Sequence, residues 1–188
     1  MQVHPVSYST QTVLCRGERF RLYIDRKTIE RRVADLGRQI AVEYREKKPI
    51  LIGVLNGAFM FFADLFREID LECEMDFIKL SSYGDARVSS GNVADLKSVD
   101  AELKGRHVIV IEDIVDTGLS MQYIMDKLRA HEPASLKVAV LLHKYEATRV
   151  ELDLDYIAFR IPNLFVIGYG LDYGQLGRNL PEIYILDT

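Results

Sequence analysis

The stretch VIVIEDIVDTGLS, Val108 to Ser120, decides how this chain is interpreted. The apolar run His107 to Ile111 predicts a strand buried on both faces, which is typical of a parallel sheet covered by helices. Two adjacent carboxylates, Glu112 and Asp113, follow directly. In an open α/β sheet the carboxyl ends of the strands line the ligand crevice, so both side chains are expected where ligands bind.

A turn of small and hydroxyl residues follows the acidic pair. Gly118 permits close approach of the backbone to a ligand, and a helix is predicted from about Leu119 to Ala130. The free N–H groups at the start of that helix, with the hydroxyls of Thr117 and Ser120, form a cradle suited to one phosphate. The stretch is not a P-loop, because GxxxxGK[ST] is absent.

Carboxylates beside a phosphate cradle require a ligand that brings hydroxyls or a cation between them. A sugar phosphate does this: Glu112 and Asp113 can accept hydrogen bonds from a ribose diol, directly or through hydrated Mg²⁺, while the turn holds the 5′-phosphate. For single residues an alternative stays open, in which the acidic pair caps the turn and Asp116 is a carboxylate favoured by the helix dipole. That alternative does not explain why all these residues occur together in the stretch Val108 to Ser120.

Strand-like and helical patterns alternate along the rest of the chain. Lys27 to Tyr44, with Asp25 as a capping residue, and Ala58 to Glu68 have apolar residues at helical spacing. The alternation predicts an α/β fold with a twisted, mainly parallel central sheet and helices on both faces. Further strands are expected at Ile50–Leu55, Glu74–Leu80, Leu136–Leu142, Tyr156–Arg160, Phe165–Ile167 and Ile183–Leu186.

The polar segment Ser81 to Gly105 contains three glycines and little periodicity, which predicts a long loop. Long loops inside compact domains are commonly lids or binding loops, so this one is a candidate for movement over a site. A hairpin without a functional role is the alternative.

Length and composition favour a single domain over residues 1–188 and limit its partners. The net charge of −4 provides no broad positive field for nucleic acid, and no apolar stretch reaches the ~20 residues that span a bilayer. Cys15 and Cys73 lack the spacing of a disulfide framework or a zinc site. We therefore expect a cytoplasmic protein with free thiols that binds neither nucleic acid nor membrane.

The stretch Val108–Ser120 resembles the phosphoribosyl-pyrophosphate (PRPP) binding signature of type I phosphoribosyltransferases: an apolar run, Glu-Asp, a short apolar pair, Asp-Thr-Gly and a hydroxyl residue. Other segments are similar to the hypoxanthine-guanine branch of that family, and the similarity covers most of the chain. These segments are Gly53–Leu65, Ser82-Tyr83, Val138–Lys144 and Ile161–Tyr173 with Arg178.

The resemblance implies both an architecture and a reaction. The family fold adds a small hood, built from segments near the two chain ends, to the twisted sheet. The implied activity belongs to purine salvage: the 5-phosphoribosyl group of PRPP passes to N9 of a 6-oxopurine, hypoxanthine or guanine, giving IMP or GMP and pyrophosphate, with Mg²⁺ as cofactor. The resemblance also implies a homodimer or homotetramer, to which the aromatic helix around Phe59 to Phe62 would contribute apolar surface. Burial of that helix under the sheet is the alternative, and the preference among the oxopurines is left open.

On the ribose and diphosphate side, the resemblance assigns Glu112 and Asp113 to the ribose diol and metal, and Asp116 to general acid/base catalysis at purine N7. Asp172 is implied as a ligand of the Mg²⁺ on the diphosphate side, and Arg178 as a cation facing pyrophosphate. The alternatives are a purely architectural Asp116 and a surface ion pair between Asp172 and Arg178.

Two loops complete the implied phosphate sites. Leu55-Asn56-Gly57 matches the pyrophosphate loop, which in the family contains a non-proline cis peptide, here at Leu55–Asn56. The phosphate of the nucleotide is implied to contact the loop residues Asp116, Thr117, Gly118, Leu119 and Ser120.

For the purine, the resemblance implies stacking on Phe165, backbone contacts at Val166 and donation from the Lys144 ammonium to the 6-oxo group. A 6-amino group would meet that ammonium donor to donor, so adenine is expected to be a poor substrate. Core packing of Phe165 and a solvated surface Lys144 are the alternatives. Ser82-Tyr83 open the segment that in the family closes over the site and excludes water.

The chain departs from the family pattern at three positions. Asn56, Leu119 and Leu164 stand where other members have lysine, and each removes a positive charge near the PRPP phosphates or the purine. We therefore expect greater reliance on Mg²⁺ and on Arg178.

Two other functions stay open at this stage. One is a non-catalytic regulator that keeps the PRPP-binding fold and associates with RNA or DNA, although the basic residues are scattered among acids and form no basic face. The other is a pyrimidine phosphoribosyltransferase, which the Lys144 and Phe165-Val166 matches disfavour.

Overall fold

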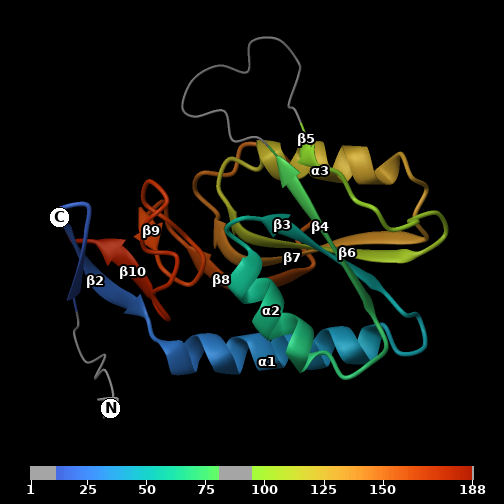
Figure 1. The fold of residues 1–188 in the computed structure, drawn as a ribbon, viewed down its shortest axis with the longest axis horizontal. Helices are drawn as coiled ribbons and strands as arrows, with labels where there is room; N and C mark the ends of the chain where they lie inside the picture. The colour runs from blue at the N-terminus through green and yellow to red at the C-terminus, as the bar shows by residue number, and fades with distance from the viewer. Residues whose placement is uncertain (1–11, 81–94, 188) are drawn as a thin grey trace, which may run out of the picture.

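The computed structural model describes residues 12–80 and 95–187, and Figure 1 shows a large sheet between helices with a smaller sheet beside it. The large sheet has the strand order β5-β4-β3-β6-β7-β8, in which all neighbours pair in parallel except β5, which is antiparallel to β4. The strands are β3 (Ile50–Leu55), β4 (Glu74–Leu80), β5 (Asp95–Lys97), β6 (His107–Val115), β7 (Ser135–Lys144) and β8 (Tyr156–Ile161). The predicted mainly parallel α/β sheet is confirmed.

Helices cover both faces of this sheet, as the alternation predicts. The helices α1 (Arg26–Glu43) and α2 (Phe59–Glu68) pack on one face, and α3 (Leu119–Arg129) packs on the other. The Asp25 carboxylate caps α1 by accepting a 2.9 Å hydrogen bond from the Thr28 amide. Where α1 crosses α2, a Cβ at Gly37 would lie 2.5 Å from the Cβ of Glu68, so only glycine permits this close approach.

The strands divide their apolar residues between two cores. On β3, Leu51 faces α1 and α2, whereas Ile50 and Ile52 face α3, and all three side chains are fully buried. Fully burying an aliphatic side chain of this size contributes about 1.5–3 kcal/mol. Burial on both faces explains why β3 and the first part of β6 read as continuous apolar runs rather than alternating ones.

The second sheet joins the two ends of the chain, in agreement with the predicted hood. Its antiparallel order is β1-β2-β10-β9. The strands are β1 (Thr12–Cys15), β2 (Glu18–Ile24), β9 (Val166–Ile167) and β10 (Ile183–Leu186). Buried Phe20 and Tyr184 lie in the small core of this sheet. The strands β1 and β2 were not predicted from the sequence.

Two predicted boundaries were wrong, and one segment stays untested. Strand β6 continues to Val115, because it stays paired with β7 along its whole length, so Glu112 and Asp113 lie inside the strand rather than after it. The predicted loop 81–105 contains β5, which pairs with the end of β4. Ser82-Tyr83 lie outside the described residues.

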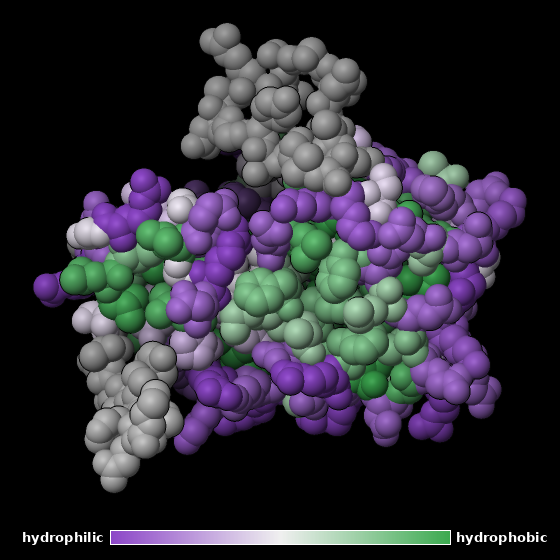
Figure 2. Space-filling model, in the orientation of Figure 1, coloured by the Kyte–Doolittle hydropathy of each residue, from purple (hydrophilic) through white to green (hydrophobic). Residues whose placement is uncertain are grey.

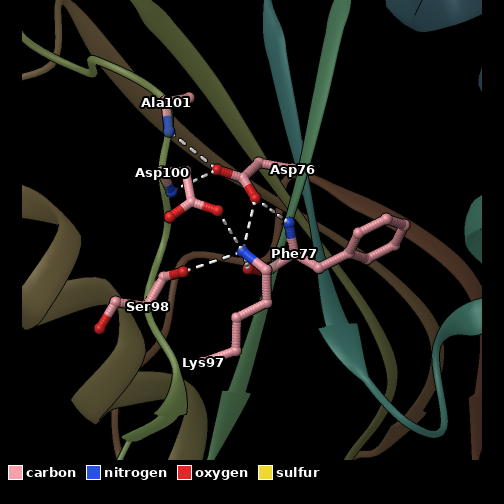
Figure 3. A network of polar contacts seen from close by, with 6 residues as sticks. All are labelled: Asp76, Phe77, Lys97, Ser98, Asp100 and Ala101. Atoms are coloured by element: carbon pink, nitrogen blue, oxygen red, sulfur yellow. Dashed lines mark hydrogen bonds and ion pairs between the residues drawn. The ribbon is translucent and has the colours of Figure 1, made fainter.

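A partly buried carboxylate holds the chain after β5 against β4 (Figure 3). Asp76 pairs with the Lys97 ammonium at 2.9 Å and accepts hydrogen bonds from the backbone amides of Phe77, Asp100 and Ala101. Burial alone would raise the pKa of Asp76, but these hydrogen bonds outweigh it and lower the pKa below its usual value. The ionised carboxylate therefore stabilises this corner of the fold.

Two further observations concern the thiols and the helices. Cys15 is buried, Cys73 is half-buried, and both are free. None of the helices within residues 12–80 and 95–187 is both long enough and apolar enough to cross a membrane.

Candidate active site

The candidate site lies where β3, β6 and β7 end at the same edge of the sheet. The Leu55–Asn56 peptide at the end of β3 is cis, as the resemblance implies. The turn after it contacts the acidic pair: a Cβ at Gly57 would lie 1.7 Å from the Asp113 carboxylate oxygen. The hood packs against the same turn, since a Cβ at Gly170 would lie 2.1 Å from the Gly57 carbonyl oxygen. The turn after β3, the acidic pair and the hood thus meet at one point.

The predicted phosphate loop has the expected geometry. Gly118 has φ +85°, a left-handed conformation that suits glycine, and α3 begins at the next residue. The first N–H groups of a helix have no partners within the helix, so they are free to face an anion. The loop encloses a hollow of about 90 Å³. Its lining residues are Glu112, Ile114, Val115, Asp116, Thr117, Gly118, Ser120 and Met121.

Of the acidic pair, Glu112 is buried and lines this hollow, and Asp113 next to it is half-buried. Burial, together with the neighbouring charge of Asp113, raises the pKa of Glu112 well above its usual value. Burial also raises the pKa of Asp113, against the opposing effects of its hydrogen bonds and of the Arg178 charge. Within residues 12–80 and 95–187 neither carboxylate has an ion-pair partner. Two adjacent carboxylates that lack a direct ion-pair partner are a donor set that fits Mg²⁺ or the hydroxyls of a ribose.

Asp116 and Lys144 form an ion pair at the mouth of the site. The Lys144 ammonium lies 2.8 Å from the Asp116 carboxylate, and the two residues come from the ends of β7 and β6. The side chain of Lys144 is 10% exposed, so the alternative of a solvated surface lysine is wrong. The Asp116 side chain is 47% exposed, so its carboxylate can contact a ligand while it stays paired with the buried Lys144.

Asp172 and Arg178 also pair with each other, at 2.6 Å, as the alternative for these residues proposed. The pair is part of the hood loop: Arg178 donates to the Gly170 carbonyl at 2.8 Å, and the Gln175 amide donates to Asp172 at 2.7 Å. Both side chains stay partly exposed. Because Gly170 touches the Gly57 turn, the loop presents this pair beside the implied diphosphate site.

The residue that the resemblance assigns to purine stacking, Phe165, has an exposed ring that contacts two other aromatic rings. Phe165 is 46% exposed, so the core-packing alternative is wrong for it. Its ring meets Tyr173 edge to face at 5.2 Å and Phe20 at 6.1 Å, and the Arg16 guanidinium lies 4.8 Å from the Tyr173 ring centre. Val166, the next residue, is buried in β9 opposite Ile185 of β10.

Sequence reasoning missed the supporting residues Tyr173, Phe20 and Arg16. The alternation of charged and apolar residues in β2, with Phe20, Leu22 and Ile24 separated by arginine and tyrosine, was the available signal for the strand that places Phe20. No local pattern indicates which aromatic rings meet across the two chain ends.

The three positions that depart from the family pattern differ in exposure. Asn56 is exposed and Leu119 is 47% exposed at the start of α3, whereas Leu164 is half-buried against the main core. Because positions 56 and 119 are exposed, a lysine at either would extend into solvent without repacking the core.

Comparison with known proteins decides the family. Residues 23–174 match the model of the phosphoribosyl transferase domain. This chain belongs to the phosphoribosyltransferase family. It is 41% identical to the hypoxanthine-guanine phosphoribosyltransferase of Bacillus subtilis, over 88% of this chain and 92% of that protein, which places it in the hypoxanthine-guanine branch.

Two other relatives extend the comparison. The bifunctional protein TilS/HprT of Listeria monocytogenes is 42% identical over 88% of this chain, and the chain spans only 26% of that longer protein. The crystal structure of a hypoxanthine-guanine phosphoribosyltransferase from Bacillus anthracis superimposes with a TM-score of 0.83 at 38% identity, covering 88% of this chain and 98% of that chain. The match in fold includes the hood as well as the large sheet.

Proposed function

We propose that this phosphoribosyltransferase acts in purine salvage, transferring the 5-phosphoribosyl group of PRPP to N9 of hypoxanthine or guanine to form IMP or GMP. The observation that carries the proposal is the convergence of three groups at one sheet edge. These are the proposed phosphate loop at 116–120, the adjacent carboxylates Glu112 and Asp113, and the 2.8 Å Asp116–Lys144 ion pair. The B. subtilis relative, whose name states this purine specificity, supports it.

The chemistry requires fixed charges around a developing cation. As the bond from ribose C1 to the diphosphate oxygen breaks, positive charge builds on the sugar, and N9 of the purine supplies the electron pair of the new bond. In this proposal Glu112 and Asp113 hold the ribose hydroxyls and stabilise that charge. Asp116, open to the ligand on one side and paired with Lys144 on the other, accepts the N7 proton as N9 attacks.

Mg²⁺ fits the carboxylates present, with Glu112 and Asp113 on the ribose side and Asp172 on the diphosphate side. When bound it would neutralise charge on the leaving diphosphate. Arg178 is already engaged with Asp172 and Gly170, so it offers the diphosphate a positioned guanidinium rather than a freely moving one.

Base selection follows from donors fixed at the purine edge. Lys144 can only donate, so it favours a 6-oxo group over a 6-amino group. The exposed face of Phe165 supplies a stacking surface, and the backbone at Val166 can read the rest of the purine edge. A buried donor facing another donor is costly, which makes adenine a poor substrate.

An assay with hypoxanthine, guanine, xanthine, adenine and uracil, each with PRPP and Mg²⁺, tests the proposal. We expect IMP and pyrophosphate from hypoxanthine and at least roughly 10³-fold lower kcat/KM with adenine. Turnover of uracil would indicate a pyrimidine enzyme instead. Binding of PRPP without turnover of any base would indicate the regulatory function.

We infer that the protein works in the cytoplasm as a homodimer or homotetramer. Figure 2 shows apolar side chains gathered over α2 and the neighbouring part of β4, where Phe59 is 43% and Met75 56% exposed. The aromatic helix is only partly buried under the fold, since Phe61 and Phe62 are buried while Phe59 is not. This surface supports contact with a second copy, and light scattering at two concentrations measures the subunit number.

A further inference from the structure

Thr148 lies directly behind the candidate catalytic pair, in the segment that follows β7. Its hydroxyl oxygen is 3.0 Å from the backbone carbonyl of Asp116 and 3.1 Å from that of Lys144. The two carbonyls belong to the two members of the ion pair, one at the end of β6 and one at the end of β7. A single hydroxyl thus joins the backbones that carry the proposed acid/base group and the proposed 6-oxo donor.

The hydroxyl is itself oriented by a histidine. The His143 Nε2 atom lies 3.1 Å from the Thr148 hydroxyl, and the Arg160 guanidinium lies 3.4 Å from His143 Nδ1. Because arginine can only donate, Nδ1 is assigned as the acceptor and Nε2 as the protonated nitrogen. Burial, and then the charge of Arg160, lower the pKa of His143, which favours the neutral ring. His143 therefore donates to Thr148, and the single Thr148 hydroxyl hydrogen is shared between the two carbonyls.

The rest of this segment packs on the phosphate loop. The Arg149 amide donates to the Thr117 carbonyl at 3.0 Å. The side chains of Val150 and Leu152 cover Gly118, since a Cβ there would lie 2.7 Å from the first and 2.8 Å from the second. Residues 148–152 thus contact three consecutive residues of the loop. No part of this segment faces the ligand hollow, so its contacts act through the loop.

We propose that Thr148 is a positioning residue for phosphoribosyl transfer, which sets the distance between the phosphate loop and Lys144 by holding both backbones with one hydroxyl. The inference rests on the function proposed above. Removing the hydroxyl frees the Asp116 carbonyl from β7 and lets the loop move relative to the purine donor. In reactions that depend on alignment, a displacement of ~1 Å can lower the rate about 10²-fold.

Three variants test this. Thr148→Val keeps the shape of the side chain and removes the hydroxyl, Thr148→Ala removes the hydroxyl without any new contact, and Thr148→Ser restores it. Thr28→Val is the matched control, because it removes a 2.8 Å hydroxyl hydrogen bond to Asp25 at the start of α1, away from the site. For each variant, kcat and the KM values for PRPP and hypoxanthine are measured together with the thermal midpoint.

We expect Thr148→Val and Thr148→Ala to lower kcat about 10-fold or more, and Thr148→Ser to recover most of it. Thr28→Val should shift the thermal midpoint by a similar amount and leave kcat unchanged. If Thr148→Val does not fold, Thr148→Ala gives the result. If the parent is active and both variants retain its kcat, or if serine fails to restore it, the inference is overturned while the proposed function stands. A parent without transferase activity overturns both.

Discussion

Replacing Gly118 by alanine is the perturbation whose cost the structure defines best. The residue has φ +85°, and a Cβ in this left-handed region costs about 1–2 kcal/mol. The same Cβ would lie 2.7 Å from Val150 and 2.8 Å from Leu152, so these side chains or the loop must move. Overpacking of this kind costs about 1–3 kcal/mol. We therefore expect Gly118→Ala to lower the free energy of unfolding by about 2–5 kcal/mol, the sum of both effects.

Gly105→Ala separates the two effects. Gly105 has φ +69° and nothing within 4 Å of its would-be Cβ, and it precedes β6 at the end of the strand opposite the phosphate loop. It should therefore show the backbone cost alone, about 1–2 kcal/mol, with no change in activity. Urea unfolding measures the stability of both variants, and steady-state kinetics measures their KM for PRPP.

The expected kinetic result is a KM for PRPP raised about 10-fold in Gly118→Ala, equivalent to roughly 1.4 kcal/mol of lost binding, because the displaced loop no longer aligns its N–H groups with the phosphate. Equal destabilisation by the two substitutions would show that Val150 and Leu152 do not constrain the loop. An unchanged KM in Gly118→Ala would refute the assignment of this loop to the phosphate.

Three further substitutions probe other parts of the account. Lys144→Met should lower kcat/KM for hypoxanthine and reduce discrimination against adenine at least about 10²-fold, which assays with the two bases would measure. The free energy of unfolding should change little, because the Asp116 side chain is 47% exposed and stays hydrated without its partner. Phe165→Ala should weaken IMP binding by about 1–3 kcal/mol in a titration, and equal affinity would exclude stacking. Asp76→Asn should cost about 1–3 kcal/mol at pH 7. Folding lowers the pKa of Asp76, so the stability difference between the parent and Asp76→Asn should be fully present above about pH 3.9. It should disappear at lower pH, as the parent carboxylate is protonated. Urea unfolding midpoints measured across pH would show this.

The elements that sequence could predict are those whose packing leaves a periodic pattern. Buried on both faces, β3 reads as a continuous apolar run, and α1 shows its buried residues at helical spacing after the Asp25 cap. The end of β6 was predicted too early because Glu112 and Asp113 are polar, yet pairing with β7 continues past them. These two polar residues interrupt the apolar pattern from which the strand was predicted.

The site residues also differ in whether a local sequence pattern predicts them. The acidic pair, the phosphate loop and Lys144 belong to contiguous motifs, so the resemblance could assign them before any geometry was known. Thr148 belongs to no motif: its contacts with Asp116 and Lys144 exist only because β6 and β7 end side by side. The substitutions described above test the roles assigned to these residues.

A crystal structure of the protein with IMP would show whether the loop after β6 binds the phosphate. We expect the 5′-phosphate against the backbone N–H groups of residues 117–120, the ribose hydroxyls at Glu112 and Asp113, and the 6-oxo group within hydrogen-bond distance of the Lys144 ammonium. A nucleotide bound elsewhere, with the loop after β6 making no contact to phosphate, would contradict it.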